Sequence, residues 1–195
     1  MASLLTDPDK FQITIEVVPP CGNDPAILLD KLNRISDLDI DGFSVATNPV
    51  AKSRMSALVF ASLLQKRTKK PAILHLTVRD HNRLGLQSEL WGAKALGLDT
   101  VIAVTGDPSA SMPDNPTTTV NDLNVFELIT MADESGLHAG CVLDYRPEVD
   151  GLDHEIARLE RKIAAGAKFI VTQPVYDEKT AQKIHAATKH VDAPV

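Results

Sequence analysis

Apolar and polar positions along the chain alternate with two different periods. Six short runs rich in β-branched residues recur about every 30 residues, which is the length of one strand–helix unit with its loops. Such runs, bounded by turn residues, are typical of β-strands. We therefore predict strands over residues 13–18, 41–47, 71–77, 100–107, 138–144 and 168–174.

Between these runs, apolar residues return every three or four positions, as they do on the buried face of an amphipathic helix. The predicted helices cover residues 25–37, 53–67, 87–96, 122–135, 152–165 and 178–190. Gly97, Gly136 and Gly166 each stand just beyond one of these patterns. Glycine is the preferred residue after a helix C-terminus, so the glycines support the division.

Consecutive strand–helix units predict a parallel sheet, which is either doubly wound or curled into a barrel. A barrel draws its site from most strand ends, whereas a doubly wound sheet concentrates its ligand groups at one switch point. No GxGxxG motif follows the first predicted strand, which counts against a dinucleotide-binding doubly wound domain. Polar residues instead close nearly every predicted strand: Glu16, Thr47, His75, Thr77, Thr105, Asp107, Asp144, Thr172 and Gln173. We therefore predict an α/β fold of the TIM-type (β/α)₈ barrel class.

The predicted barrel is incomplete within this chain. Residues 1–195 are read as a single domain with about six of the eight strand–helix units that a full barrel contains. Residues 193–195 resemble the start of a seventh strand. Open sheet edges invite pairing with another chain, so we expect a homo-oligomer.

Composition and charge narrow the class of partner. The chain has 20 Lys and Arg residues against 26 Asp and Glu residues, and this acidic balance disfavours a nucleic-acid or membrane-surface partner. No apolar run is long enough for a membrane span. Cys21 and Cys141 are far apart and indicate no disulfide framework, so the expected location is the cytoplasm. The six histidines lack zinc-ligand spacing, and we expect no metal site.

Glu16 is an unusual residue for a predicted strand, because an isolated buried charge is costly. Alternation places Ile15 and Val17 toward the helices and Thr14 and Glu16 toward the barrel interior. Glu16 would then lie near the mouth, where barrel active sites form. From position alone, a catalytic carboxylic acid and a glutamate paired with a lysine or arginine across the barrel fit equally well.

Each of the other candidate groups also has an ordinary structural explanation. The segment 105–108, Thr-Gly-Asp-Pro, is common turn chemistry, and a strand histidine such as His75 is more often a core group than a catalyst. On the fifth predicted helix, a solvated salt-bridge face competes with a phosphate-binding role for Glu155, Arg158, Arg161 and Lys162. Gln173 can both donate and accept hydrogen bonds, which suits an amide-rich ring. Together these groups favour a large, ring-containing, phosphorylated ligand over a metal ion.

Several of these segments together resemble the methylenetetrahydrofolate reductases. The segments that carry the resemblance are Glu-x-x-Pro-Pro from residue 16, His-Leu-Thr at 75–77, Thr-Gly-Asp-Pro at 105–108 and Thr-Gln-Pro-x-Tyr-Asp from residue 172. Residues 48–56 and 79–87 look closest to the type that is fused to homocysteine S-methyltransferase domains. The resemblance runs from about residue 11 to the end of the chain.

The resemblance implies a flavoprotein barrel that uses FAD to reduce 5,10-methylenetetrahydrofolate to 5-methyltetrahydrofolate, a step of one-carbon metabolism that serves methionine biosynthesis. It implies that Glu16 is the general acid, that Asp107 lies against the pyrimidine end of the flavin, and that Gln173 contacts the pterin and, in turn, the nicotinamide donor. Flavin contacts are implied for Thr47, His75, Thr105, Gly106, Asp107, Glu155, Arg158, Arg161 and Lys162. The electron donor would be NADH, NADPH or a partner flavoprotein.

The sequence also departs from the family pattern. Val17 and Val18 replace the aromatic residues that many members carry after the strand-one glutamate, and Arg158 stands where some relatives have a neutral amide. Residues 143–150 align ambiguously and receive no role. Because the last two units of the barrel are missing, two further hypotheses stay open. One is a flavin- or folate-binding subunit that needs a partner chain, and the other is a barrel lyase or aldolase.

Overall fold

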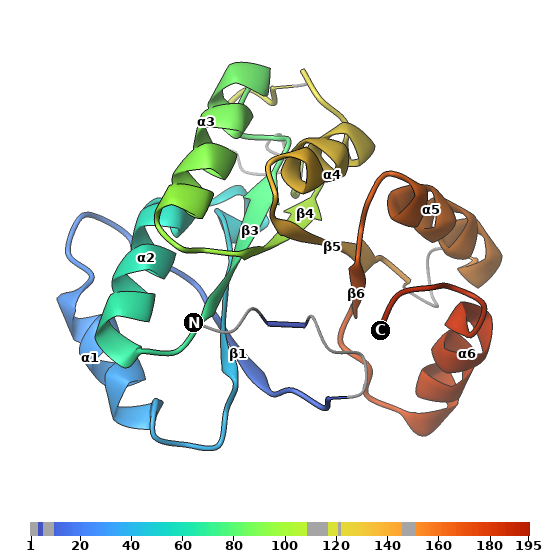
Figure 1. The fold of residues 1–195 in the computed structure, drawn as a ribbon, viewed down its shortest axis with the longest axis horizontal. Coiled ribbons are helices and arrows are strands. Elements are labelled where there is room, and N and C mark those ends of the chain that lie inside the picture. Colours follow the sequence, from blue (N-terminus) through green and yellow to red (C-terminus); the bar gives the residue numbers. More distant parts are fainter. Residues whose placement is uncertain (1–3, 6–9, 109–116, 121, 146–150) are drawn as a thin grey trace.

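Six strands and six α-helices alternate along the part of the chain that the structure describes (Figure 1). The computed structural model describes residues 4–5, 10–108, 117–120, 122–145 and 151–195. The strands are β1 (Thr14–Val17), β2 (Gly42–Val45), β3 (Ala72–Thr77), β4 (Thr100–Val104), β5 (His138–Leu143) and β6 (Phe169–Thr172). The helices are α1 (Ala26–Ile35), α2 (Ala57–Thr68), α3 (Arg83–Ala95), α4 (Val125–Glu134), α5 (Leu152–Ala164) and α6 (Glu178–Thr188), and the short 3₁₀ helix η1 spans Pro49–Ala51.

The strands form one parallel sheet in the order β1-β2-β3-β4-β5-β6. A doubly wound sheet reverses its strand order, and this one does not. The sheet curls, and the helices lie along its outer side (Figure 1). These observations confirm the predicted class: the fold is a partial (β/α) barrel of the TIM type.

The alternation of side chains divides the core into two clusters. Outward-facing strand residues such as Phe43 and Leu74 are fully buried beneath helix residues such as Phe60 and Leu64. Inward-facing residues form a second cluster inside the curl, made of Leu4, Ile73, Ile102 and Phe169. The sheet is therefore buried on both faces, as parallel sheets usually are.

Residues near the N-terminus lie across the floor of the curl, at the N-terminal ends of the strands. The Thr100 hydroxyl donates to the Leu4 carbonyl at 3.3 Å, and the ring Nε2 of His138 lies 2.7 Å from the Leu5 carbonyl oxygen. The His138 ring also stacks on Phe169, with ring centroids 5.2 Å apart. These contacts fasten a segment from the start of the chain to β4 and β5.

Several helix boundaries differ from the predicted ones, most of all the starts of α2, α3 and α4. Helix α3 begins one turn earlier than predicted because the Asn82 side chain accepts from the Gly85 amide at 2.9 Å and caps the helix there. Helix α2 begins after Ser56, its N-cap, so Met55 precedes the helix that was predicted to contain it. Gly97, Gly136 and Gly166 follow α3, α4 and α5 with positive φ angles, as predicted.

Residues 193–195, predicted as the start of a further strand, lie beside β6. The Ile170 amide donates to the Pro194 carbonyl at 2.8 Å. This bond fixes the segment next to the last strand of the described sheet.

Candidate functional site

A cavity of about 370 Å³ opens at the C-terminal ends of the strands, and all six strands or their following loops contribute to its wall. This volume lies within the usual range for small-molecule sites. The predicted site residues that line it are Glu16, Thr47, His75, Thr105, Gly106, Asp107, Arg158, Lys162 and Gln173. Positions that are up to 157 residues apart in the sequence therefore share one wall.

Glu16 reaches the cavity because of the strand alternation. Val17 is buried in the core beneath the helices and Ile15 packs against the same core, whereas Glu16 is exposed toward the cavity. Pro19 and Pro20 follow after Val18, and the Pro20 carbonyl accepts from the Met55 amide at 2.9 Å. The strand therefore ends just beyond the carboxylate, which leaves Glu16 at the rim of the cavity.

His75 faces the interior from β3, and Ser44 faces it from the neighbouring strand β2. The Ser44 hydroxyl oxygen lies 2.7 Å from the ring Nε2 of His75. Burial lowers the pKa of His75 from 6.5 to about 4. The imidazole is therefore neutral at physiological pH, and it can act there as a hydrogen-bond partner but not as a cation.

The turn after β4 is held closely against β3. Gly106 has a φ of +85°, and a Cβ placed on it would lie 2.2 Å from the Thr77 hydroxyl oxygen, so a larger residue is excluded. That hydroxyl donates to the Thr105 carbonyl at 2.8 Å. The Asp107 carboxylate follows at the rim, where it accepts from the Val50 amide at 2.7 Å.

Helix α5 brings charged residues to the opposite wall. The Lys162 side chain is 5% exposed, and its ammonium donates to the Val142 carbonyl at 2.6 Å. Burial lowers the pKa of Lys162 below its ordinary value. Arg158 lies one turn before it and donates to Glu155 Oε1 at 3.3 Å. Glu155 is 2% exposed, and its Oε2 is buried without a hydrogen-bond partner among the described residues.

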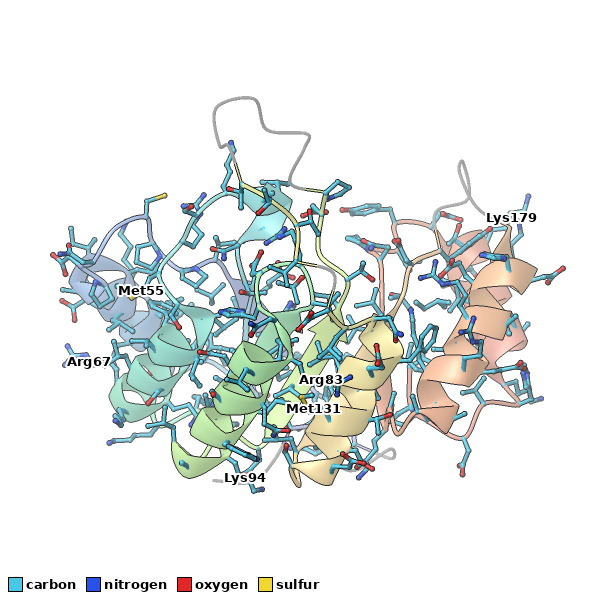
Figure 2. The ribbon with its side chains drawn as sticks, turned by 90° about the horizontal axis from the view of Figure 1, so that it is seen from above. Met55, Arg67, Arg83, Lys94, Met131 and Lys179 are labelled. Carbon is cyan, nitrogen blue, oxygen red and sulfur yellow. The ribbon has the colours of Figure 1, made fainter. Side chains whose placement is uncertain are left out.

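Arg161 differs from the other three predicted site residues of α5 in where it points. Its guanidinium carbon lies 4.3 Å from the centre of the Phe126 ring on α4, and the side chain lines a groove on the outer surface. Arg83 and Met131 line the same groove between α3 and α4 (Figure 2). The solvated-face explanation therefore describes the position of Arg161, while Arg158 and Lys162 face the cavity.

Gln173 lies at the end of β6, and its amide nitrogen donates to Asp144 Oδ1 at 2.8 Å. Asp144 also lines the cavity, although the ambiguous alignment of residues 143–150 gave it no role. Residues 146–150 lie outside the described part of the chain. The hydrogen bond fixes the orientation of the Gln173 amide, so the amide can read a ligand with a defined donor and acceptor.

Two residues of the site escaped the sequence reasoning. Ser44 was hidden because a serine inside a strand is unremarkable until its cross-strand partner His75 is known. Arg79, in the loop after β3, is 5% exposed and lines the cavity. The sequence could have indicated Arg79, because it stands two residues beyond the His-Leu-Thr segment. A charged side chain at that position has to lie close to the mouth of the cavity.

The described residues lack two kinds of feature. Within these ranges, none of the helices combines the length and the apolar character needed to cross a membrane. The same ranges contain no group of three or more His, Cys, Asp or Glu side chains placed to hold a metal ion.

Comparison with known proteins identifies relatives. A profile of the family described as methylenetetrahydrofolate reductase matches residues 2–192. A Caenorhabditis elegans protein named probable methylenetetrahydrofolate reductase (NADPH) is 26% identical over 196 aligned residues, which cover 92% of this chain and 28% of that protein. The chain therefore spans little more than a quarter of the length of this relative.

Solved structures share the fold. An uncharacterized protein from Clostridium thermocellum, described as binding two copies of 5-methyl-5,6,7,8-tetrahydrofolic acid, superposes with a TM-score of 0.70 at 20% identity. That match covers 96% of this chain and 64% of the other. A 2,3-dimethylmalate lyase of the PEP mutase/isocitrate lyase superfamily superposes with a TM-score of 0.61 at 12% identity, over 95% of this chain and 65% of the lyase.

Proposed function

Because this chain belongs to the methylenetetrahydrofolate reductase family, we propose that it serves in the reduction of 5,10-methylenetetrahydrofolate to 5-methyltetrahydrofolate, with FAD as its cofactor. One observation carries the proposal: most residues for which the resemblance implies a role line a single cavity at the C-terminal ends of the strands. This is the place where (β/α) barrel enzymes build their active sites.

The chemistry of the cavity fits a flavin nucleotide. Glu155 is not among the residues that line the cavity, and it would act on a ligand through Arg158, whose guanidinium donates to Glu155 Oε1. Arg158 and Lys162 would supply positive charge to the phosphates, while Gly106 and Asp107 would approach the ring system. When bound there and reduced by the electron donor, the flavin would supply the hydride for the one-carbon unit.

Glu16 would act on the folate as a general acid. It would hold a proton at the rim of the cavity and donate it to the folate as the five-membered ring of the substrate opens. Gln173 would contact the pterin, because its amide orientation is fixed by Asp144. The neutral His75 would contact the cofactor as a hydrogen-bonding group.

The electron donor would be NADH, NADPH or a partner flavoprotein. We place the reaction in the cytoplasm, which the cysteine usage supports. We also propose a homo-oligomer, which the apolar residues exposed on α3, Leu84 and Trp91, support. Light scattering of the purified chain would test the oligomer, and a monomer at micromolar concentration would contradict it.

The decisive experiment is a flavin titration followed by turnover. The purified chain should take up FAD and show a flavin absorption spectrum, and it should then oxidise NADH or NADPH in the presence of methylenetetrahydrofolate. Absence of FAD binding at a concentration of about 100 μM, where a weak micromolar site would be filled, would contradict the cofactor assignment.

A second candidate is a flavin- or folate-binding subunit that requires a partner chain. The observation that favours it is the sheet, whose described order runs from β1 to β6 without pairing β6 to β1. FAD and folate binding without turnover, followed by turnover after addition of a longer family member, would identify this case. A barrel aldolase would use a lysine as the Schiff base, and reductive trapping at Lys162, which lines the cavity, would reveal it.

A further inference from the structure

The Arg79 guanidinium joins two loops at the rim of the cavity. Its Nη1 donates to the Asp107 carbonyl in the loop after β4, and its Nη2 donates to the Asn48 carbonyl in the loop after β2, both at 3.1 Å. Asp80 accepts from the same guanidinium through both carboxylate oxygens. A planar, forked donor is suited to span two carbonyls in this way.

The loop after β2 needs such support because its backbone is strained. Asn48, Val50 and Ala51 all have positive φ angles, of 39°, 50° and 54°. Non-glycine residues pay a conformational cost in this region and persist there only when their surroundings hold them. The Asn48 side chain donates to Asp80 at 3.0 Å and accepts from the Arg54 amide at 2.9 Å. The turn is therefore held from several sides.

The strained turn after β2 also holds Asp107. The Val50 amide points at Asp107 Oδ2, and the bond is 2.7 Å long. Arg79 thus controls both sides of this contact: it bonds the backbone of Asp107 directly, and it bonds the turn that carries the Val50 amide. Asp80 balances the charge of Arg79, so the arginine orients the Asp107 carboxylate without pairing with it.

We propose that Arg79 is a positioning residue that fixes the Asp107 carboxylate and the β2 turn relative to each other at the cavity rim. The inference deepens the proposed function, since Asp107 is there assigned to the flavin ring. Its effect on a bound flavin would be indirect and would run through Asp107. A carboxylate held near the ring opposes the gain of electrons by the flavin. Losing that constraint would raise the midpoint potential of the flavin.

The first arm of the test uses the chain without flavin. Arg79→Lys keeps the positive charge and loses the fork, so hydrogen exchange of the Val50 amide should become faster by about tenfold or more. The matched control is Arg67→Lys, which alters an exposed ion pair with Asp30 far from the mouth and should leave Val50 exchange unchanged. Unchanged Val50 exchange in folded Arg79→Lys would overturn the proposal.

If Arg79→Lys does not fold, Asn48→Gly tests the support of the same turn, because it keeps the Asn48 carbonyl that accepts from Arg79 and loosens the turn around it. Glycine tolerates the positive φ of position 48 but removes the side-chain bonds to Asp80 and Arg54. Faster Val50 exchange would support the proposal, and exchange equal to that of the unaltered chain would contradict it. This arm does not depend on flavin binding, so failure of the proposed function leaves its result readable.

The second arm asks whether Arg79 acts through Asp107. In the flavin-loaded protein, Arg79→Lys and Asp107→Asn should each raise the midpoint potential. If the arginine acts through the aspartate, Arg79→Lys should cause no further shift in the Asp107→Asn background. Additive shifts would overturn the inference, because they would show that Arg79 acts on the flavin independently.

Discussion

The Ser44 hydroxyl lies 2.7 Å from Nε2 of His75, across the pair of strands β2 and β3 on the inner face of the sheet. Because the ring is buried, the folded chain keeps His75 neutral down to a pH of about 4, whereas the unfolded chain protonates it near 6.5. The contribution of His75 to stability is therefore complete above pH 6.5 and is lost as the pH falls toward 4.

We expect the free energy of unfolding to fall by up to about 1.4 kcal/mol per pH unit in this window because of His75. His75→Gln should remove this component of the slope, as measured by urea unfolding at pH 7 and pH 5. The matched control is His185→Gln, at an exposed position on α6. If the unaltered chain and His75→Gln lost the same free energy of unfolding between pH 7 and pH 5, His75 would not be the group responsible.

Glu16→Gln keeps the shape of the side chain and removes its acidic proton. If Glu16 is the general acid, folate reduction should fall by about 10²- to 10⁴-fold, while FAD binding and flavin reduction by the donor stay within about twofold. Stopped-flow absorbance separates the two half-reactions. Glu160→Gln, at an exposed position on α5, serves as the control. Normal folate turnover in Glu16→Gln would exclude the acid role.

Lys162→Met retains most of the buried volume and deletes the ammonium. If Lys162 contacts the FAD phosphates, affinity for FAD should drop by about ten- to a hundredfold, the equivalent of one charge-assisted hydrogen bond. Isothermal titration measures the dissociation constant. Lys183→Met, at an exposed position on α6, should leave it unchanged. An unaltered dissociation constant for Lys162→Met would place the phosphates elsewhere.

Gly140→Ala tests the packing inside the curl. A Cβ at this position would lie 2.2 Å from the Phe169 ring, so the variant should lose about 1–3 kcal/mol of stability through overpacking. Gly151→Ala is the same substitution at a place where a Cβ meets none of the described residues within 4 Å, and it should be nearly neutral. Adding Phe169→Leu should recover part of the loss in Gly140→Ala. Thermal unfolding would show no difference between the two glycine variants if the ring could move aside freely.

The order of the elements could be predicted from the sequence because each strand–helix unit is a local pattern. Sequential units in a parallel sheet then leave little freedom of topology, and the alternation around Glu16 was enough to aim that carboxylate into the cavity. The start of α3 was missed because Gly85 breaks the helical pattern, and only the Asn82 cap shows that the helix already includes it.

Contacts between distant loops were beyond sequence reasoning. Arg158, Arg161 and Lys162 share a helical stripe in the sequence, but Phe126 on the neighbouring helix draws Arg161 to the outer surface. Arg79 joins two loops by donating to backbone carbonyl groups. Every residue has such a group, so no sequence pattern indicates which ones accept. Such a role emerges only when the loops are placed in space.

The contacts of Leu4 and Leu5 at the floor of the curl have a consequence for the order of folding. They join residues that are 96 and 133 positions apart, whereas each strand pairs with the next one along the chain. During synthesis, the early strand–helix units can form before these two partners exist, and the segment can make both contacts only after His138 has left the ribosome. Closing so long a loop late in folding should slow unfolding more than it speeds folding. The contacts at the floor should therefore add mainly to the kinetic stability of the folded sheet.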